Sequence, residues 1–169
     1  PDWVHCSSFI RVSIAPKLMA ITASVDESNS LIELFHPELS SLKLKIDSPQ
    51  FSEKIIHWIS SLCPENGPQS FKICKVPNRG MTDTDYPSVS LLSFSSLDLL
   101  SRKAGLNLDK RRFRGNLWMK NSIPFDEFNW VGSNIKIGEV ELEVIEPIER
   151  CNATKTNPQN GIRDIDTLQ

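Results

Sequence analysis

The sequence lacks several features that would mark a specialised class of protein. No apolar stretch approaches the ~20 residues that a membrane-spanning helix needs, so we expect no membrane partner. Neither charge is in large excess, because 19 Lys and Arg residues stand against 21 Asp and Glu residues and the formal net charge is -2. Without a global positive field we expect no nucleic-acid partner. The 169 residues include only 7 glycines against 11 prolines, with 39% hydrophobic and 24% charged positions. This is the composition of an ordinary soluble globular domain.

The cysteines are few and widely spaced, at Cys6, Cys63, Cys74 and Cys151. They form no C-x-x-C pair and have no histidine at zinc-ligand spacing, which indicates reduced thiols and a cytoplasmic protein. The beginning, Pro1-Asp2-Trp3, resembles neither an initiator start nor a signal peptide. We therefore expect the chain to be a fragment.

The first half of the chain changes from a strand pattern to a helix pattern at Ser48. Apolar residues then recur at helical spacing from Phe51 to Leu62, with Ser48 as the expected N-cap and Pro49 at the first helical position. An extended segment over 71–76 and a surface loop over 77–87 follow. Before Ser48 the pattern predicts antiparallel strands at 9–14, at 17–25, on both sides of His36-Pro37, and at 42–46, where apolar and basic residues alternate.

The second half predicts one short helix among strands. The helix begins near Ser95, with Asp98 completing a capping box, and ends at Gly105. Residues 112–119 have strand character, and 135–144 predict two strands joined at Gly138-Glu139, with Val140, Leu142 and Val144 facing inward. The fold class is therefore mainly β (α+β), with a barrel and helices packed at its side.

Two clusters contain chemically capable residues, and the first is the basic run from Lys110 to Asn116. If this run is extended, Arg112, Arg114 and Asn116 lie on one face, where guanidinium groups and an amide suit a phosphate or a heteroaromatic ring. The alternative is a solvated basic strand edge that discourages aggregation.

The second cluster surrounds Cys151, which follows a predicted strand and precedes a turn-rich loop. Arg150, Thr154 and Thr156 are placed to stabilise a thiolate, which is the form that acts as a nucleophile or as a ligand for a soft metal. The alternative is a buried cysteine that serves as a small hydrophobic residue.

The ordered set of motifs resembles the signature of MOSC domains, which are named after the C-terminal module of molybdenum cofactor sulfurase. Asp85-x-Pro87 and Ser96-Leu97 resemble the loop and helix that precede the signature, while 9–80 resemble, more loosely, the β-barrel domain that commonly precedes a MOSC domain. The motifs are Arg112-Phe113-Arg114-x-Asn116, Glu127-x-x-Trp130 with Gly132, Ile137-Gly138-x-Val140-x-Leu142-x-Val144, Arg150-Cys151-x-x-Thr154 and Asn157-Pro158-x-x-Gly161.

The resemblance implies a domain organisation and a fold. Residues 1–80 correspond to a partial N-terminal barrel-like region with one helix. Residues 81–169 correspond to a MOSC-type β-barrel with flanking short helices that lacks its C-terminal strands. Members of the family often have proline where this chain has Gly115.

The resemblance also implies a cofactor and an activity. Proteins similar to the amidoxime-reducing component bind the molybdenum cofactor (molybdopterin) and supply a cysteine to the metal, which corresponds to Cys151. Arg114 and Asn116 correspond to residues that approach the pterin and its phosphate. The resemblance places Arg150, Thr154, Ser88 and Asp85 among the cofactor-contacting or supporting residues.

The expected function is therefore that of an oxidoreductase that reduces small N-hydroxylated compounds. It requires an external electron-transfer reductase, because the sequence has no flavin, haem or iron–sulfur motif. The alternative is a sulfur-carrier or cofactor-delivery module with a persulfide on Cys151. The family also has an association with pyridoxal phosphate. A third reading, an RNA-binding barrel that uses Lys110 to Arg114, is disfavoured by the charge balance.

Overall fold

The computed structural model describes residues 4–67, 72–74, 80–120 and 123–169. The chain divides into two compact units. Unit 1 contains residues 1–88 and 152–169, and unit 2 contains residues 89–151. Within the described ranges, no helix has the length and apolar character needed to cross a bilayer.

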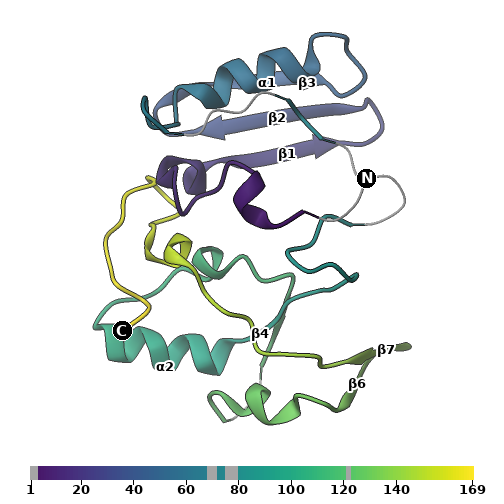
Figure 1. Ribbon diagram of the computed structural model, residues 1–169, viewed down its shortest axis with the longest axis vertical. Coiled ribbons are helices and arrows are strands. Elements are labelled where there is room, and N and C mark those ends of the chain that lie inside the picture. Colours follow the sequence, from purple (N-terminus) through teal and green to yellow (C-terminus); the bar gives the residue numbers. More distant parts are fainter. Residues whose placement is uncertain (1–3, 68–71, 75–79, 121–122) are drawn as a thin grey trace. The chain divides into compact units, whose positions relative to one another are not determined.

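Unit 1 contains an antiparallel sheet in the order β1-β2-β3, formed by β1 (Thr22–Asp26), β2 (Leu31–His36) and β3 (Leu39–Lys45). The predicted strands on both sides of His36-Pro37 are confirmed. The alternation in β3 is confirmed too, because Leu44 is buried while Lys43 and Lys45 are exposed. The α1 helix packs on β3 and runs along it in Figure 1.

Two predictions for the beginning of the chain are wrong. Residues 9–14 form a turn, in which the amides of Ile14 and Ala15 both donate to the carbonyl of Arg11. The strand expected at 17–25 begins only at Thr22, because Pro16 starts a 3₁₀ helix, η2 (Pro16–Ala20), at a position that needs no backbone donor. A first 3₁₀ helix, η1, spans Cys6–Ser8.

The predicted amphipathic helix exists as α1 (Phe51–Ser60). It begins two residues later than expected, because the amide of Phe51 closes a turn on the carbonyl of Ser48 before the helix starts. Gln50 is the N-cap residue and provides no side-chain cap. The extended segment expected at 71–76 lies largely outside the described residues, and 72–74 form no strand. Residues 80–87 contain neither helix nor strand, in agreement with the predicted loop, whereas 77–79 lie outside the described residues.

The C-terminal segment of unit 1 packs against its beginning. After η5 (Asn152–Lys155), Thr156 forms an isolated antiparallel bridge with Arg163. The guanidinium of Arg163 donates to the carbonyl of Ser13 over 2.6 Å. Gly161 has a φ of 72°, and a Cβ there would lie 2.5 Å from the Cα of Lys17.

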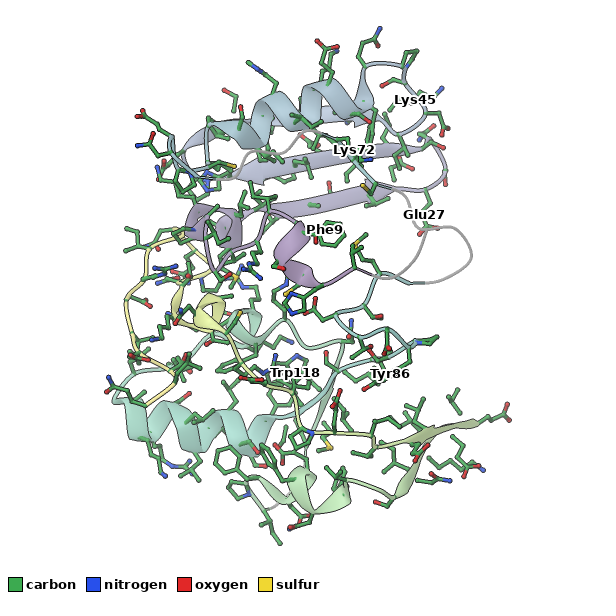
Figure 2. All side chains as sticks on the ribbon, viewed as in Figure 1. Phe9, Glu27, Lys45, Lys72, Tyr86 and Trp118 are labelled. Carbon is green, nitrogen blue, oxygen red and sulfur yellow. The ribbon has the colours of Figure 1, made fainter. Side chains whose placement is uncertain are left out.

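Unit 2 contains a β-α-β connection. β4 (Leu91–Ser93) pairs in parallel with β5 (Leu117–Met119), and α2 (Phe94–Ala104) lies between them in the sequence. A crossover of this kind is what a parallel pair requires. The ring of Trp118, a residue labelled in Figure 2, packs 5.2 Å from the ring of Phe94, so β5 and α2 are joined by an aromatic contact.

The end of α2 is confirmed and its cap is corrected. Gly105 adopts the left-handed conformation (φ 69°) at the C-terminus, as the sequence predicts. At the other end, the Oγ of Ser93 accepts the amide of Ser96, so Ser93 and not Ser95 is the N-cap. Ser93 fills this role because it still has the extended backbone of β4 (φ -111°, ψ 133°).

The predicted hairpin is confirmed as β6 (Asn134–Ile137) and β7 (Val140–Glu143), which turn at Gly138 (φ 62°). Its predicted inner face is confirmed only in part. Leu142 and Val144 are half-buried, whereas Val140 is 58% exposed because it stands directly after the turn. A 3₁₀ helix, η4 (Asp126–Trp130), precedes the hairpin.

These elements confirm a mixed α+β fold. The part of the chain that the structure describes contains a three-stranded sheet, two two-stranded sheets and two α-helices, with no closed barrel. The barrel remains a prediction.

Candidate functional site

The basic run does not form the predicted strand. Residues Lys110–Phe113 form a 3₁₀ helix, η3, and Arg114 follows it in the left-handed conformation with a φ of 48°. The period-two argument that placed Arg112, Arg114 and Asn116 on one face is therefore wrong. Arg112 is buried, whereas Arg114 and Asn116 are exposed.

The conformation of Arg114 is unusual for a residue with a side chain. A non-glycine residue in this region costs on the order of 1–3 kcal/mol and persists only where its surroundings impose it. The exposed guanidinium forms no hydrogen bond or ion pair with any residue that the structure describes. It therefore remains available to an external anion.

Gly115 brings the backbone after Arg114 close to the interior of unit 2. A Cβ at this position would lie 2.5 Å from the Cδ1 of Leu92 and 2.8 Å from the Nε1 of Trp118. No side chain fits there without displacing one of these neighbours. The glycine thus permits the turn to lie against β4 and β5.

Asn116 fixes the far end of the same turn. Its Oδ1 accepts hydrogen bonds from the backbone amide and the Oγ of Ser90, each over 2.9 Å. The backbone amide of Asn116 in turn donates to the Oγ of Ser90 over 3.0 Å. This reciprocal pair holds the start of β5 to the residue before β4, so the carbonyl half of the Asn116 side chain is already occupied within the protein.

The two clusters selected from the sequence are joined by Arg150. Its Nη1 donates to the carbonyl of Phe113 over 3.0 Å, and its guanidinium carbon lies 5.9 Å from the centre of the Phe113 ring. Phe113 precedes Arg114, and Arg150 precedes Cys151. The contact therefore joins the backbone at 150–151, the Cys151 loop, to the turn at 113–116, the Arg114 turn.

Cys151 has an exposed side chain. The alternative of a buried cysteine that acts as a small hydrophobic residue is therefore wrong. The partial burial of Arg150 lowers the pKa of its guanidinium, and the electrostatic effect of Cys151 opposes that decrease. The thiol thus stands beside a guanidinium cation.

The rest of the basic run is engaged within the protein. Asp109 accepts the amide of Arg111 and forms a bidentate ion pair with its side chain, with a shortest distance of 2.6 Å. These bonds hold the pKa of Asp109 below its ordinary value. The Nζ of Lys110 lies 5.5 Å from the ring centre of Phe94.

A network of hydrogen bonds joins the first turn of α2 to residues 125–130. The Oγ of Ser96 donates to the Oε1 of Glu127 over 2.6 Å and accepts the amide of Phe125 over 2.8 Å. The Nε1 of Trp130 donates to Asp126 over 3.2 Å. The Glu127-x-x-Trp130 motif therefore lies on η4 and joins it to the first turn of α2.

The remaining predicted site residues belong to unit 1. Thr154 is buried, and its Oγ1 lies 2.6 Å from that of Thr167. The hydroxyl of Ser88 lies 2.8 Å from that of Thr84, and Asp85 is exposed.

The sequence predicts no role for Ser90, and none for Phe113 beyond its place in the motif. Ser90 is 26 residues from Asn116, and Phe113 contributes its backbone carbonyl to Arg150. A carbonyl acceptor leaves no signal in the residue type. Among the described residues, no three His, Cys, Asp or Glu side chains group together in a way that would hold a metal ion.

The family model of the MOSC domain matches residues 79–168, which is just over half of the chain. The chain is 25% identical over 124 residues to a molybdenum cofactor sulfurase of Drosophila grimshawi, with 69% of this chain and 16% of that protein aligned. It is 32% identical over 78 residues to the molybdenum cofactor sulfurase of Drosophila willistoni, covering 46% of this chain and 10% of that protein.

A third relative has a different name. The mitochondrial amidoxime-reducing component 1 of Mus musculus is 26% identical over 135 residues, covering 72% of this chain and 39% of that protein. The chain thus spans well under half the length of each of these relatives.

Proposed function

Because the chain belongs to the MOSC domain family, we propose that it binds the molybdenum cofactor, with Cys151 as the protein ligand of the metal and Arg114 as a ligand of the cofactor phosphate. Relatives named for molybdenum cofactor sulfurase and for an amidoxime-reducing component support this proposal. The observation that carries it is the Arg150–Phe113 hydrogen bond, which joins the Cys151 loop to the Arg114 turn.

The donor groups of unit 2 fit such a cofactor. A thiolate is the soft ligand that a sulfur-preferring metal selects, and the thiol of Cys151 is exposed. A guanidinium matches the geometry of a phosphate, and that of Arg114 is exposed. The occupied Oδ1 of Asn116 leaves the Nδ2 group of this side chain to approach the pterin.

Each of these residues has a part in the proposed reaction. The bound cofactor would supply a metal that changes oxidation state while oxygen leaves a small N-hydroxylated substrate. Removing that oxygen as water takes two electrons and two protons, and the electrons come from a separate reductase. Cys151 holds the metal, Arg114 binds the phosphate, and Asn116 keeps the turn closed on Ser90. A MOSC-type barrel over 81–169, preceded by a partial barrel-like region over 1–80, is part of the same proposal.

The test is the metal content of protein purified from a host that makes the cofactor. We expect near-stoichiometric molybdenum in the wild type and its loss in Cys151→Ala. Cys74→Ala is the matched control, because Cys74 is also an exposed thiol but lies in unit 1. Absence of molybdenum from the wild-type protein would overturn the proposal, and so would equal losses in the two variants.

The second candidate is a carrier that holds sulfur as a persulfide on Cys151. The relatives named as sulfurases and the exposure of this thiol favour it. Intact-protein mass spectrometry would then find one additional sulfur atom, removed by a thiol reductant and absent from Cys151→Ala. Molybdenum without persulfide supports the cofactor proposal, and persulfide without molybdenum supports the carrier.

A further inference from the structure

Arg150 lies next to Cys151 in the sequence, but its side chain points back to η3. We propose that Arg150 is a positioning residue that holds the backbone in front of Arg114, so that the side chain of Arg114 alone provides the guanidinium for the cofactor phosphate. This inference rests on the proposed function. It assigns the two arginines of the site different tasks.

The geometry of Arg150 is that of a structural clamp. Its Nη1 donates to the carbonyl of Phe113 over 3.0 Å, and the same guanidinium lies over the Phe113 ring at 5.9 Å. Phe113 itself is buried, with 8% of its surface exposed. A hydrogen bond from a cation to a carbonyl in such surroundings is worth more than one in water.

The carbonyl that Arg150 binds belongs to the residue directly before Arg114. Phe113 is the last residue of η3, and carbonyls at the end of a helix lack partners within the helix. The next residue is Arg114, whose left-handed backbone needs support from its surroundings. The amide of Arg114 donates to the carbonyl of Arg111 over 3.2 Å, which closes the turn from the other side.

The two guanidinium groups also differ in what they contact. That of Arg150 is partly buried and bonded to Phe113, whereas that of Arg114 is exposed and bonded to no residue that the structure describes. A phosphate in solution therefore meets Arg114 directly. Arg150 acts on the phosphate only through the backbone that it holds.

A double-mutant cycle on the loaded protein separates the two tasks. The measurement is the rate at which the pterin is released, followed by its fluorescence. In protein that retains Arg114, we expect Arg150→Ala to increase the release rate about tenfold, which corresponds to ~1.4 kcal/mol. In the Arg114→Ala background we expect less than about a twofold effect, because the group that is positioned has been removed. Equal effects in both backgrounds would identify Arg150 as a direct ligand and overturn the inference.

The matched control is Arg102→Ala. Arg102 is an exposed arginine of the same unit, in the last turn of α2, and we expect no change in release rate. Arg150→Lys keeps a cationic donor on a slightly shorter chain, so it should restore a large part of the lost retention. If Lys restores no more than Ala although the protein folds, the clamp is not the reason for the effect.

Hydrogen exchange gives a readout that does not need the cofactor. In the unloaded protein, Arg150→Ala should increase exchange at the amide of Arg114, whereas Arg102→Ala should not. Unchanged exchange would overturn the inference even if the wild type binds molybdenum. Increased exchange in a protein that binds no molybdenum would overturn the proposed function and leave the clamp standing.

Discussion

Lys17 and Gly161 touch through their backbones, although they lie 144 positions apart in the sequence. The Cα of Lys17 lies 2.5 Å from the place where a Cβ on Gly161 would stand, and the carbonyl oxygen of Lys17 lies 3.1 Å from it. That same oxygen accepts a hydrogen bond from the Nε2 of the buried His36, also over 3.1 Å. The C-terminal turn, η2 and the end of β2 therefore meet at one backbone carbonyl.

The first prediction concerns Gly161→Ala. The substitution combines a strained left-handed residue (φ 72°) with a clash against backbone that cannot rotate away. We expect a loss of about 2–4 kcal/mol in the free energy of unfolding, measured by urea denaturation. Gly138→Ala is the control, because Gly138 has a similar φ of 62° with nothing near its Cβ, and it should lose only about 1 kcal/mol. Equal losses would show that the contact with Lys17 contributes nothing.

Gly115→Ala tests the close approach of the Arg114 turn to β4 and β5. The new Cβ would meet the end of the Leu92 side chain and the ring of Trp118. We expect a destabilisation of about 1–3 kcal/mol by urea denaturation. Because Leu92 contributes the nearest atom, Leu92→Ala should be less destabilising in the Gly115→Ala background than in the wild type. Additive losses of stability would mean that the two side chains do not compete for space.

The N-cap of α2 can be identified directly by substitution. Ser93→Ala removes the acceptor of the Ser96 amide and should cost about 1 kcal/mol in the free energy of unfolding. Ser95→Ala should cost less, since the Oγ of Ser95 contacts that of Ser93 but does not cap the helix. If Ser95→Ala were the more damaging change in thermal unfolding, the helix would begin where the sequence alone places it.

How far the sequence predicts this fold depends on whether its signals are local. The alternation in β3, the turn at Gly138 and the stop at Gly105 are set by neighbouring residues, and all three are confirmed. The strand expected at 112–119 fails at its beginning because Asp109 caps the amide of Arg111 and starts η3.

The candidate site follows the same rule. Both clusters are visible in the residue types, and the sequence selects Arg114 and Cys151. Their connection is not visible, because the Phe113 carbonyl that accepts Arg150 is a backbone group 37 positions away. Ser90 is not predicted for the same reason. It is distant from Asn116 in the sequence and contacts it only because β4 and β5 pair.

The cap of η3 also predicts a pH dependence. The Arg111 side chain and amide hold the pKa of Asp109 below its ordinary value, ~3.9. The interactions of the ionised carboxylate stabilise the fold fully when the pH is above that ordinary pKa. This stabilisation disappears as the pH falls through the folded-state pKa. Asp109→Ala should therefore lose about 1 kcal/mol at pH 7 and less at pH 3, measured by urea denaturation. Asp83→Ala, at an exposed aspartate in unit 1, should show no such difference. A loss for Asp109→Ala that is equal at both pH values would mean that its charge has no part in the cap.

The last prediction ranks the thiols by their reaction with iodoacetamide. Cys151 and Cys74 are exposed, whereas Cys63 is half-buried and its Sγ donates to the carbonyl of Ile59 over 3.3 Å. Burial raises the pKa of Cys63, so less of its thiolate is present at pH 8 and its alkylation should be slow. Peptide mass spectrometry should find Cys151 and Cys74 labelled well before Cys63. When the molybdenum cofactor is bound, only Cys151 should become protected, because a thiolate that is bound to the metal cannot be alkylated. Cys74 should remain accessible to the reagent. Protection of both thiols would indicate a general change in the protein, and protection of neither would place the cofactor away from Cys151.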